Sequence, residues 1–316
     1  MNTPQTAQLP TAPAVGEGQR AKRLTLAQRD ALYGYLFVLP QVIGFFLFVL
    51  GPLIAVFVFS MQERNLLSDR VDLAGLANYR QMLAGPLFGK VLVNSLIFMV
   101  GLVPLNLAIS LTLAIMLARS SRRVSFFRSI IFLPVVTSAV AWAIVWNFIL
   151  QGEQGALNQL LALVGIRGPN WLGDPTWAMF SVILVRVLKN VGLNVVIFVA
   201  ALQDLPRDIV EAAEVDGATR WQSARHIIIP FLAPAIMFVT IITVIGSLNV
   251  FDHIMLLTGG GPSNATMVLA FYVYHAAFRM YEIGYASTLA VVLFLLALLL
   301  TIVQWALRRR FVYSEN

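Results

Sequence analysis

The chain contains no cysteine, and charged residues are scarce for its length of 316 residues. Without cysteine, neither a disulfide nor a thiolate metal site can form. Its three histidines, His226, His253 and His275, are far apart and lack the spacing of a zinc motif such as HExxH. No stretch has the GxxxxGK[ST] pattern of a phosphate-binding loop. We therefore expect no metal site, no directly bound cofactor and no nucleotide site in this chain.

Charged residues make up 12% of the chain, hydrophobic residues make up 59%, and the mean hydropathy is +0.81. Soluble domains carry about twice that share of charge. A helix needs roughly 20 predominantly apolar residues to cross a bilayer. Internal prolines are tolerated there because neighbouring helices satisfy the freed backbone groups. The sequence predicts an all-α, polytopic membrane protein with six transmembrane helices, over residues 31–61, 91–118, 129–151, 177–202, 227–251 and 283–307.

The distribution of basic residues predicts the orientation of these spans. With the N-terminus in the cytoplasm, fourteen of the 22 Lys and Arg residues lie on the cytoplasmic side and six lie on the other. This bias places both termini in the cytoplasm. It also accounts for the net charge of +7 without a nucleic-acid partner. The predicted organisation is a disordered cytoplasmic tail over 1–28, a six-span domain over 29–310 and a C-terminal tail over 311–316.

The polar interval 204–230 separates two apolar runs and reads as two short helices. Pro206 suits the first turn of the first helix. Gly217 supplies a stop that can take a positive φ angle. Thr219 and Gln222 have the spacing of a capping box for the second helix, which Pro230 ends or kinks. The interval therefore predicts a helix–glycine–helix element that docks onto a soluble partner.

The same interval carries a recognisable spacing: Glu-Ala-Ala at 211–213, glycine at 217, isoleucine at 227 and Ile-Pro at 229–230. This resembles the EAA loop of binding-protein-dependent ABC importer permeases, although an aromatic residue often found in its second helix is replaced by Ala224. The resemblance implies a type I ABC importer transmembrane domain. It also implies that the ATPase is contacted by Glu211, Ala212, Ala213, Asp216, Gly217 and Ala218.

Three further stretches restrict the resemblance to one subclass of these permeases. They are GLANY at 75–79, FDHIMLLTGGGP at 251–262 and GYAS at 284–287. Together they resemble the first of the two permeases in carbohydrate importers of the maltose and glycerol-3-phosphate type, in a bacterial or archaeal cytoplasmic membrane. This resemblance implies a heterodimer with a second permease, two ATPase subunits that hold ATP and Mg²⁺, an extracytoplasmic solute-binding protein and surrounding membrane lipid.

The fourth span carries two cations that predict a substrate path. Arg186, Lys189, Asn190 and Leu193 share one helical face. A charged side chain at the membrane centre costs about 2.5–3.5 kcal/mol, so this face is expected to turn toward protein or water. By resemblance, its register matches the sugar-contacting face of maltose-type permeases. A matching face on the fifth span consists of Thr243, Ser247 and Val250, with Asn249 adjacent.

The sequence alone does not decide whether the ligand is anionic or neutral. Arg186 and Lys189 favour an anionic ligand such as a sugar phosphate, but Arg186 can instead pair with a carboxylate or with carbonyls of the partner permease. Trp142 and Trp146 can stack on a sugar or anchor and pack the third span. The apolar stretch 267–278 is too short to cross and predicts a helix at the outer interface.

Two other classes of protein fit the composition less well. An ion-coupled secondary transporter of small polar solutes is expected to carry acidic residues within its spans and an internal repeat. No Asp or Glu lies inside any of the six runs. A membrane enzyme would need a nucleophile with a base, or a metal constellation, and the spans contain none. An importer permease is therefore the favoured prediction.

Overall fold

The computed structural model describes residues 25–65, 67–118 and 121–311, which are mostly helical. In this part of the chain, four helices are long and apolar enough to cross a membrane, and two bent helix pairs raise the number to six when each pair forms one span. The predicted all-α fold with six spans is confirmed. Residues 1–24 of the predicted N-terminal tail and 312–316 of the C-terminal tail lie outside the described residues.

The first unit of the chain, residues 1–54, is helical from Leu26 onward. Helix α1 (Leu26–Phe45) begins with a capping box in which the Thr25 hydroxyl accepts from the Gln28 backbone and the Gln28 side chain accepts from the Thr25 backbone. The π-helical segment η1 (Phe46–Leu50) and helix α2 (Gly51–Ser60) continue the same run. The helix therefore begins before residue 31, where the sequence predicts the span to start.

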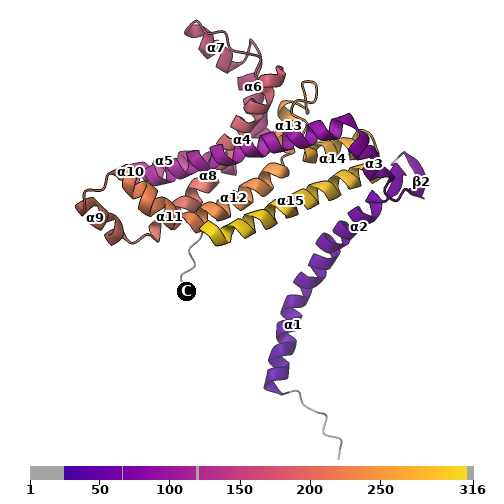
Figure 1. Ribbon diagram of the computed structural model, residues 1–316, viewed down its shortest axis with the longest axis horizontal. Coiled ribbons are helices and arrows are strands. Elements are labelled where there is room, and N and C mark those ends of the chain that lie inside the picture. The colour runs from indigo at the N-terminus through magenta and orange to yellow at the C-terminus, as the bar shows by residue number, and fades with distance from the viewer. Residues whose placement is uncertain (1–24, 66, 119–120, 312–316) are drawn as a thin grey trace, which may run out of the picture. The chain divides into compact units, whose positions relative to one another are not determined.

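The second unit, residues 55–316, is organised around long helices that run alongside one another (Figure 1). Helix α4 packs against α8 and α12, and α12 also packs against α15. Proline occupies the start of α4 and of α8, and the Asp174 side chain caps α8 by accepting from the backbone N–H of Thr176 at 2.7 Å. These helices are α4 (Pro86–Met116), α8 (Pro175–Gln203), α12 (Ala233–Leu248) and α15 (Ile283–Phe311).

The third and fifth predicted spans are broken. Helix α5 (Arg122–Val136) meets α6 (Ala139–Leu150) at 100°, because Thr137 and Ser138 between them leave the helical region with ψ angles of 152° and 137°. The fifth span bends by 68°. It consists of α10 (Arg220–Ser223), the π-helical η2 (Ala224–Ile228), α11 (Ile229–Phe231) and then α12.

Short elements connect the long helices. Strands β1 (Gln62–Asn65) and β2 (Ser68–Leu73) form an antiparallel hairpin where no strand is predicted. Gly284 permits this arrangement, because a Cβ atom there would lie 1.9 Å from the Gln62 carbonyl oxygen. The other short helices are α3 (Ala77–Ala84), α7 (Ala156–Leu163), α9 (Arg207–Val215), α13 (Asp252–Leu257) and α14 (Leu269–Phe278).

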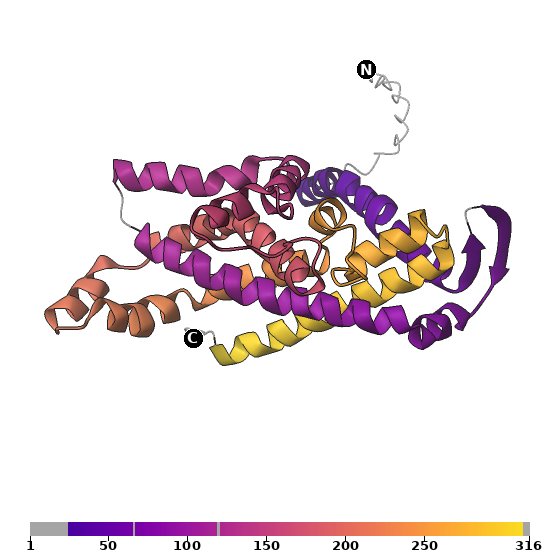
Figure 2. The same ribbon diagram turned by 90° about the horizontal axis from the view of Figure 1, so that it is seen from above.

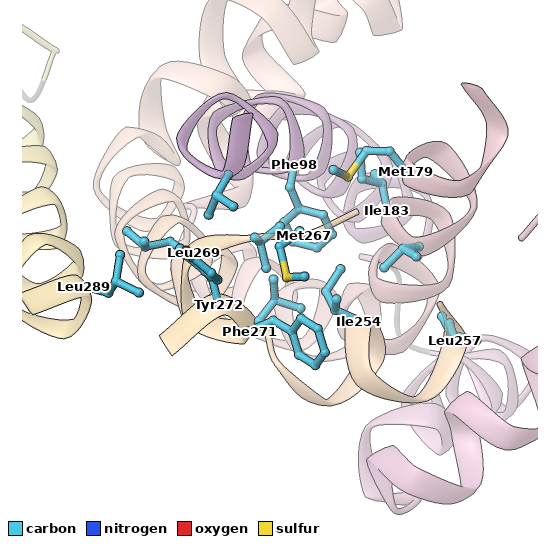
Figure 3. Packing of buried hydrophobic residues seen from close by; sticks show 14 of the residues in the cluster. Phe98, Met179, Ile183, Ile254, Leu257, Met267, Leu269, Phe271, Tyr272 and Leu289 are labelled. Carbon is cyan, nitrogen blue, oxygen red and sulfur yellow. The ribbon is translucent and has the colours of Figure 1, made fainter. Parts of the chain in front are cut away.

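The main apolar core joins α4, α8, α13 and α14 (Figure 3). Phe98 of α4, Met267, Ile254 of α13 and Phe271 of α14 all belong to this core. The stretch 267–278 is helical from Leu269, as predicted. Its predicted surface position is wrong, because most of its side chains are buried in this core rather than spread over a membrane surface. An apolar stretch of this length fits a buried helix as well as an interfacial one.

Candidate functional site

The interval 204–230 folds as two helices joined by a tight turn at one end of the second unit (Figures 1 and 2). Gly217 adopts a φ of 81°. The Ala218 N–H donates to the Ala213 carbonyl at 2.9 Å, and the Gly217 N–H donates to the Glu214 carbonyl at 3.1 Å. This is a Schellman termination, which requires the left-handed residue that glycine supplies. The predicted helix stop is confirmed.

The second helix of this element starts as the sequence predicts. The Thr219 hydroxyl accepts from the Gln222 backbone N–H at 3.4 Å, and the Gln222 side-chain oxygen accepts from the Thr219 backbone N–H at 2.8 Å. Pro206 is the N-cap of α9 rather than its first helical residue. Local contacts therefore end α9 and begin α10, so that the two helices form one compact element.

The predicted ATPase-contacting residues lie together on this element. Glu211 and Ala212 are exposed on α9, and Asp216 and Gly217 are exposed in the turn, while Ala213 and Ala218 are half-buried. Glu211 makes no ion pair with the described part of the chain. The turn also borders a hollow of about 370 Å³. The acidic side chain of Glu211 and the turn at Asp216 and Gly217 are therefore accessible to a partner protein.

An aromatic side chain projects from the second helix of this element, although not at the position expected from the family. Ala224 lies in η2 and is half-buried. Trp221, three residues earlier on α10, has 70% of its surface exposed. A large exposed aromatic ring next to a turn is typical of an interface anchor. Trp221 is not among the predicted site residues, although the run Thr-Arg-Trp-Gln after the glycine contains it.

Arg186, in the middle of α8, pairs with a carboxylate of the same chain. Its Nη1 lies 3.6 Å from Oδ1 of Asp252 and 3.2 Å from Nδ1 of His253, both on α13. Asp252 Oδ1 also accepts from the His253 backbone N–H at 3.0 Å. Burial raises the pKa of Asp252, but the hydrogen bond from His253 and the charges of His253 and Arg186 outweigh it and lower the pKa to about 2. Asp252 is therefore ionised at neutral pH.

The side chain of Lys189 contacts the third span at its break. Its Nζ donates to the carbonyls of Pro134 and Val135, to the Thr137 carbonyl at 2.6 Å and to the Thr137 hydroxyl at 3.2 Å. The carbonyls at the end of a helix lack intrahelical partners and carry partial negative charge. Lys189, which is only 7% exposed, thus satisfies the end of α5 at the break.

Gly192 lies one turn after Lys189 and allows α5 to approach α8 closely. A Cβ atom at this position would lie 2.3 Å from the Ile131 carbonyl oxygen and 3.1 Å from the Phe132 Cα atom. Both contacts involve backbone atoms, which cannot rotate away as a side chain does. Glycine and lysine on α8 therefore hold the broken span in place.

Replacing Lys189 with methionine is expected to destabilise the subunit. Methionine keeps the apolar stem but leaves carbonyls at the end of α5 without a donor, and each buried unsatisfied group costs about 1–3 kcal/mol. The midpoint of thermal unfolding in detergent measures this change. Lys90→Met is the matched control, because exposed Lys90 donates to one carbonyl, that of Ser263. Equal midpoints for the two variants would contradict the capping role.

The remaining predicted path residues divide into exposed and buried groups. Asn190 is half-buried, Leu193 is 43% exposed and Asn249 is exposed. Thr243, Ser247 and Val250 are buried inside the bundle. The predicted face of α8 is therefore accessible in part, whereas the predicted face of α12 packs against its neighbours.

A buried polar contact explains the position of Thr243. Its hydroxyl accepts from Asn194 of α8 at 3.4 Å, and Asn194 also donates to Oδ1 of Asn106 on α4. Neither asparagine is among the predicted site residues, although a polar amide inside an apolar run signals an interhelical contact. Asp252 and His253, the partners of Arg186, are not among them either. Within the described residues, no group of three His, Asp or Glu side chains could hold a metal ion.

The chain matches a family of known proteins over residues 110–313, described as the binding-protein-dependent transport system inner membrane component. It is 36% identical over 295 residues to the lactose transport system permease protein LacF of Rhizobium radiobacter, with 91% of this chain and 98% of the relative covered. It is 31% identical over 293 residues to the arabinooligosaccharides transport system permease protein AraP of Bacillus subtilis, with 90% and 92% covered.

The fold is similar to that of a solved transporter. A chain in the crystal structure of a bacterial alginate ABC transporter, in complex with an alginate pentasaccharide-bound periplasmic protein, superposes with a TM-score of 0.79 at 23% identity, covering 91% of this chain and 97% of that one. The predicted type I ABC permease fold is confirmed. ATP hydrolysis in this family is carried by a separate subunit. This chain belongs to the family of binding-protein-dependent ABC transporter permeases, as a multi-pass, non-enzymatic subunit of the cytoplasmic membrane.

Proposed function

We propose that this chain is the first of two different permeases in an ATP-driven importer of carbohydrates. Relatives named for lactose and arabinooligosaccharide transport support a sugar or sugar-derived solute. The observation that carries the proposal is the exposed element of α9, Gly217 and α10 at one end of an apolar bundle, in a sequence without a nucleotide-binding motif. In this proposal, a separate ATPase subunit drives the conformational change of the chain.

The coupling step in this proposal runs through the α9–α10 element. The bias of basic residues supports a cytoplasmic position for this element, where an ATPase acts. Glu211 is exposed and pairs with a basic residue of the ATPase, and the Asp216–Gly217–Ala218 turn rests against the same partner. Closure of two ATP- and Mg²⁺-loaded ATPase subunits then pulls the element and rocks the spans between inward-facing and outward-facing states.

The substrate path in this proposal follows the accessible face of α8. Asn190 and Leu193 line it, and the exposed Asn249 at the C-terminal end of α12 is assigned to the same path. Lys189, Thr243, Ser247 and Val250 are buried and shape the wall behind it. A second permease supplies the opposite wall, and a solute-binding protein on the far side of the membrane delivers the ligand.

Reconstitution of the full importer tests this function. The chain is co-expressed with a second permease and an ATPase from the same organism, purified and placed in proteoliposomes with a solute-binding protein. We expect uptake of a carbohydrate that requires ATP inside the vesicles, and ATPase activity that the loaded binding protein stimulates. Uptake by this chain alone, driven by an ion gradient without ATP, would establish the secondary-transporter alternative and overturn the proposal.

Replacing Trp221 with alanine is expected to reduce binding-protein-stimulated ATPase activity at least about tenfold, because a buried aromatic anchor contributes about 2 kcal/mol or more to an interface. Within the permease, Trp221 is 70% exposed, so the fold should be unaffected. Trp221→Phe keeps an aromatic ring and should retain most activity. If the alanine variant couples as well as the phenylalanine variant, Trp221 is not the anchor.

A further inference from the structure

A hollow of about 450 Å³ lies between the α9–α10 element and the end of α4, and we call it the α4 hollow. It is separate from the hollow that borders the turn at Gly217. Its apolar wall includes Ile115 of α4 and Ile228 of η2, both half-buried. Glu214 of α9 and Arg220 of α10 add an acidic and a basic side chain. This mixed lining suits a group with an apolar body and a polar tip.

Ser223, which also borders the α4 hollow, has a buried hydroxyl without a partner. The residue is 6% exposed, and among the described residues nothing forms a hydrogen bond with its Oγ atom. Ser95 of α4, by contrast, donates to the Val91 carbonyl four residues earlier at 2.8 Å. A buried polar group without a hydrogen bond is disfavoured and rare. The Ser223 hydroxyl therefore indicates that a polar group is to be received here.

Two charges beside the α4 hollow are also unpaired. Glu214 and Arg220 are exposed, and neither forms an ion pair in the part of the chain that the structure describes. Hydrocarbon satisfies neither a charge nor a hydroxyl. Opposite charges beside an unpartnered hydroxyl instead suit a protein surface, on which polar groups of both signs are available. The α4 hollow therefore favours a protein occupant over lipid.

The small side chain of Ala224 keeps this space open. Ala224 borders the α4 hollow and is half-buried in η2. A larger side chain at this position would take up part of the hollow from within the permease. Alanine leaves the space to a group that enters from outside.

We propose that the α4 hollow is a socket for one side chain of the ATPase, with an apolar body and a hydrogen-bonding tip, such as tyrosine. Its body packs against Ile115 and Ile228, and its tip bonds Ser223, whose hydroxyl turns about a single side-chain torsion. This inference rests on the coupling step of the proposed function. It adds a contact of the opposite sense, in which the ATPase enters the permease and touches α4 as well as the α9–α10 element.

Replacing Ser223 with alanine tests the socket through two measurements. The variant removes a hydroxyl that has no partner within the permease, so the thermal unfolding midpoint of the full-length chain in detergent should not fall. It also leaves the ATPase tip without a partner. A fluorescent ATPase should therefore exchange out of the assembled complex in nanodiscs at least about fivefold faster. A structural serine would lower the midpoint and leave the exchange rate unchanged, which would overturn the inference.

Ser129→Ala is the matched control for this variant. Ser129 is exposed on α5, and its hydroxyl donates to the Ser125 carbonyl at 3.1 Å, away from the α4 hollow. The ATPase should leave this complex at the wild-type rate. Equally fast exchange in both serine variants would contradict a specific contact at Ser223.

The variant Ala224→Phe fills the α4 hollow from within the permease. Its phenyl ring takes the space of the incoming side chain, so the ATPase should leave the complex at least about tenfold faster than from the wild type. Ala224→Ser adds little volume and should stay within about twofold of the wild type. Unchanged or slower exchange in Ala224→Phe would show that the hollow receives nothing, and would overturn the inference while leaving the importer function intact. A wild-type complex that holds no ATPase would instead refute the importer function. If Ala224→Phe does not assemble, Ser223→Ala decides.

Discussion

Replacing Gly192 with alanine is expected to lower the amount of assembled importer at least about tenfold. The added Cβ atom would lie 2.3 Å from the Ile131 carbonyl oxygen, so α5 must move away from α8. Overpacking of this kind costs about 1–3 kcal/mol or more, and 1.4 kcal/mol is already about a tenfold change in an equilibrium. The same movement takes the end of α5 away from Lys189. Fluorescence-detected size-exclusion chromatography of the co-expressed complex measures the assembled fraction.

Gly246→Ala is the matched control for this change. Gly246 lies in α12, and a Cβ atom there meets no heavy atom within 4 Å. Alanine is also the better helix former, by about 1 kcal/mol. The control should therefore assemble as well as the wild type. If the two alanine variants assemble equally, the close approach of α5 and α8 is not required for the fold.

Replacing Glu211 with lysine is expected to abolish coupling while leaving assembly of the permease intact. In the proposed complex, Glu211 pairs with a basic residue of the ATPase, and breaking an interfacial charge pair from one side costs about 2–5 kcal/mol or more. Uptake and binding-protein-stimulated ATPase activity should therefore fall at least about tenfold. The fold should survive, because Glu211 is exposed and forms no ion pair within the described residues.

Asp204→Lys serves as the control for this charge reversal. Asp204 is exposed in the same interval, but it follows α8 and precedes the EAA spacing. A lysine at the end of a helix is compatible with the helix dipole. Loss of coupling in both variants would point to the net charge of the loop rather than to Glu211. Normal coupling in Glu211→Lys would refute the proposed contact.

The loop and the spans were largely predictable because their signals are local. Gly217 ends a helix through its own φ angle, and Thr219 caps the next helix through a residue three positions away. Spans are signalled by composition over about 20 residues. The break in the third span was not predictable in this way. Its donor, Lys189, comes from a helix about 50 residues further along the chain, and hydropathy averages over both halves of the bend.

The same distinction between local and long-range signals applies to the polar residues within the spans. Composition and charge bias by themselves predict a multi-span membrane protein, and the EAA spacing identifies it, by resemblance, as an importer permease that a separate ATPase drives. Only the tertiary structure decides that Lys189 terminates α5, that Arg186 meets Asp252 and that Thr243 is buried beside Asn194. The physical reason is that a charge or an amide in an apolar run must be satisfied, but its partner is chosen by packing between segments distant in sequence.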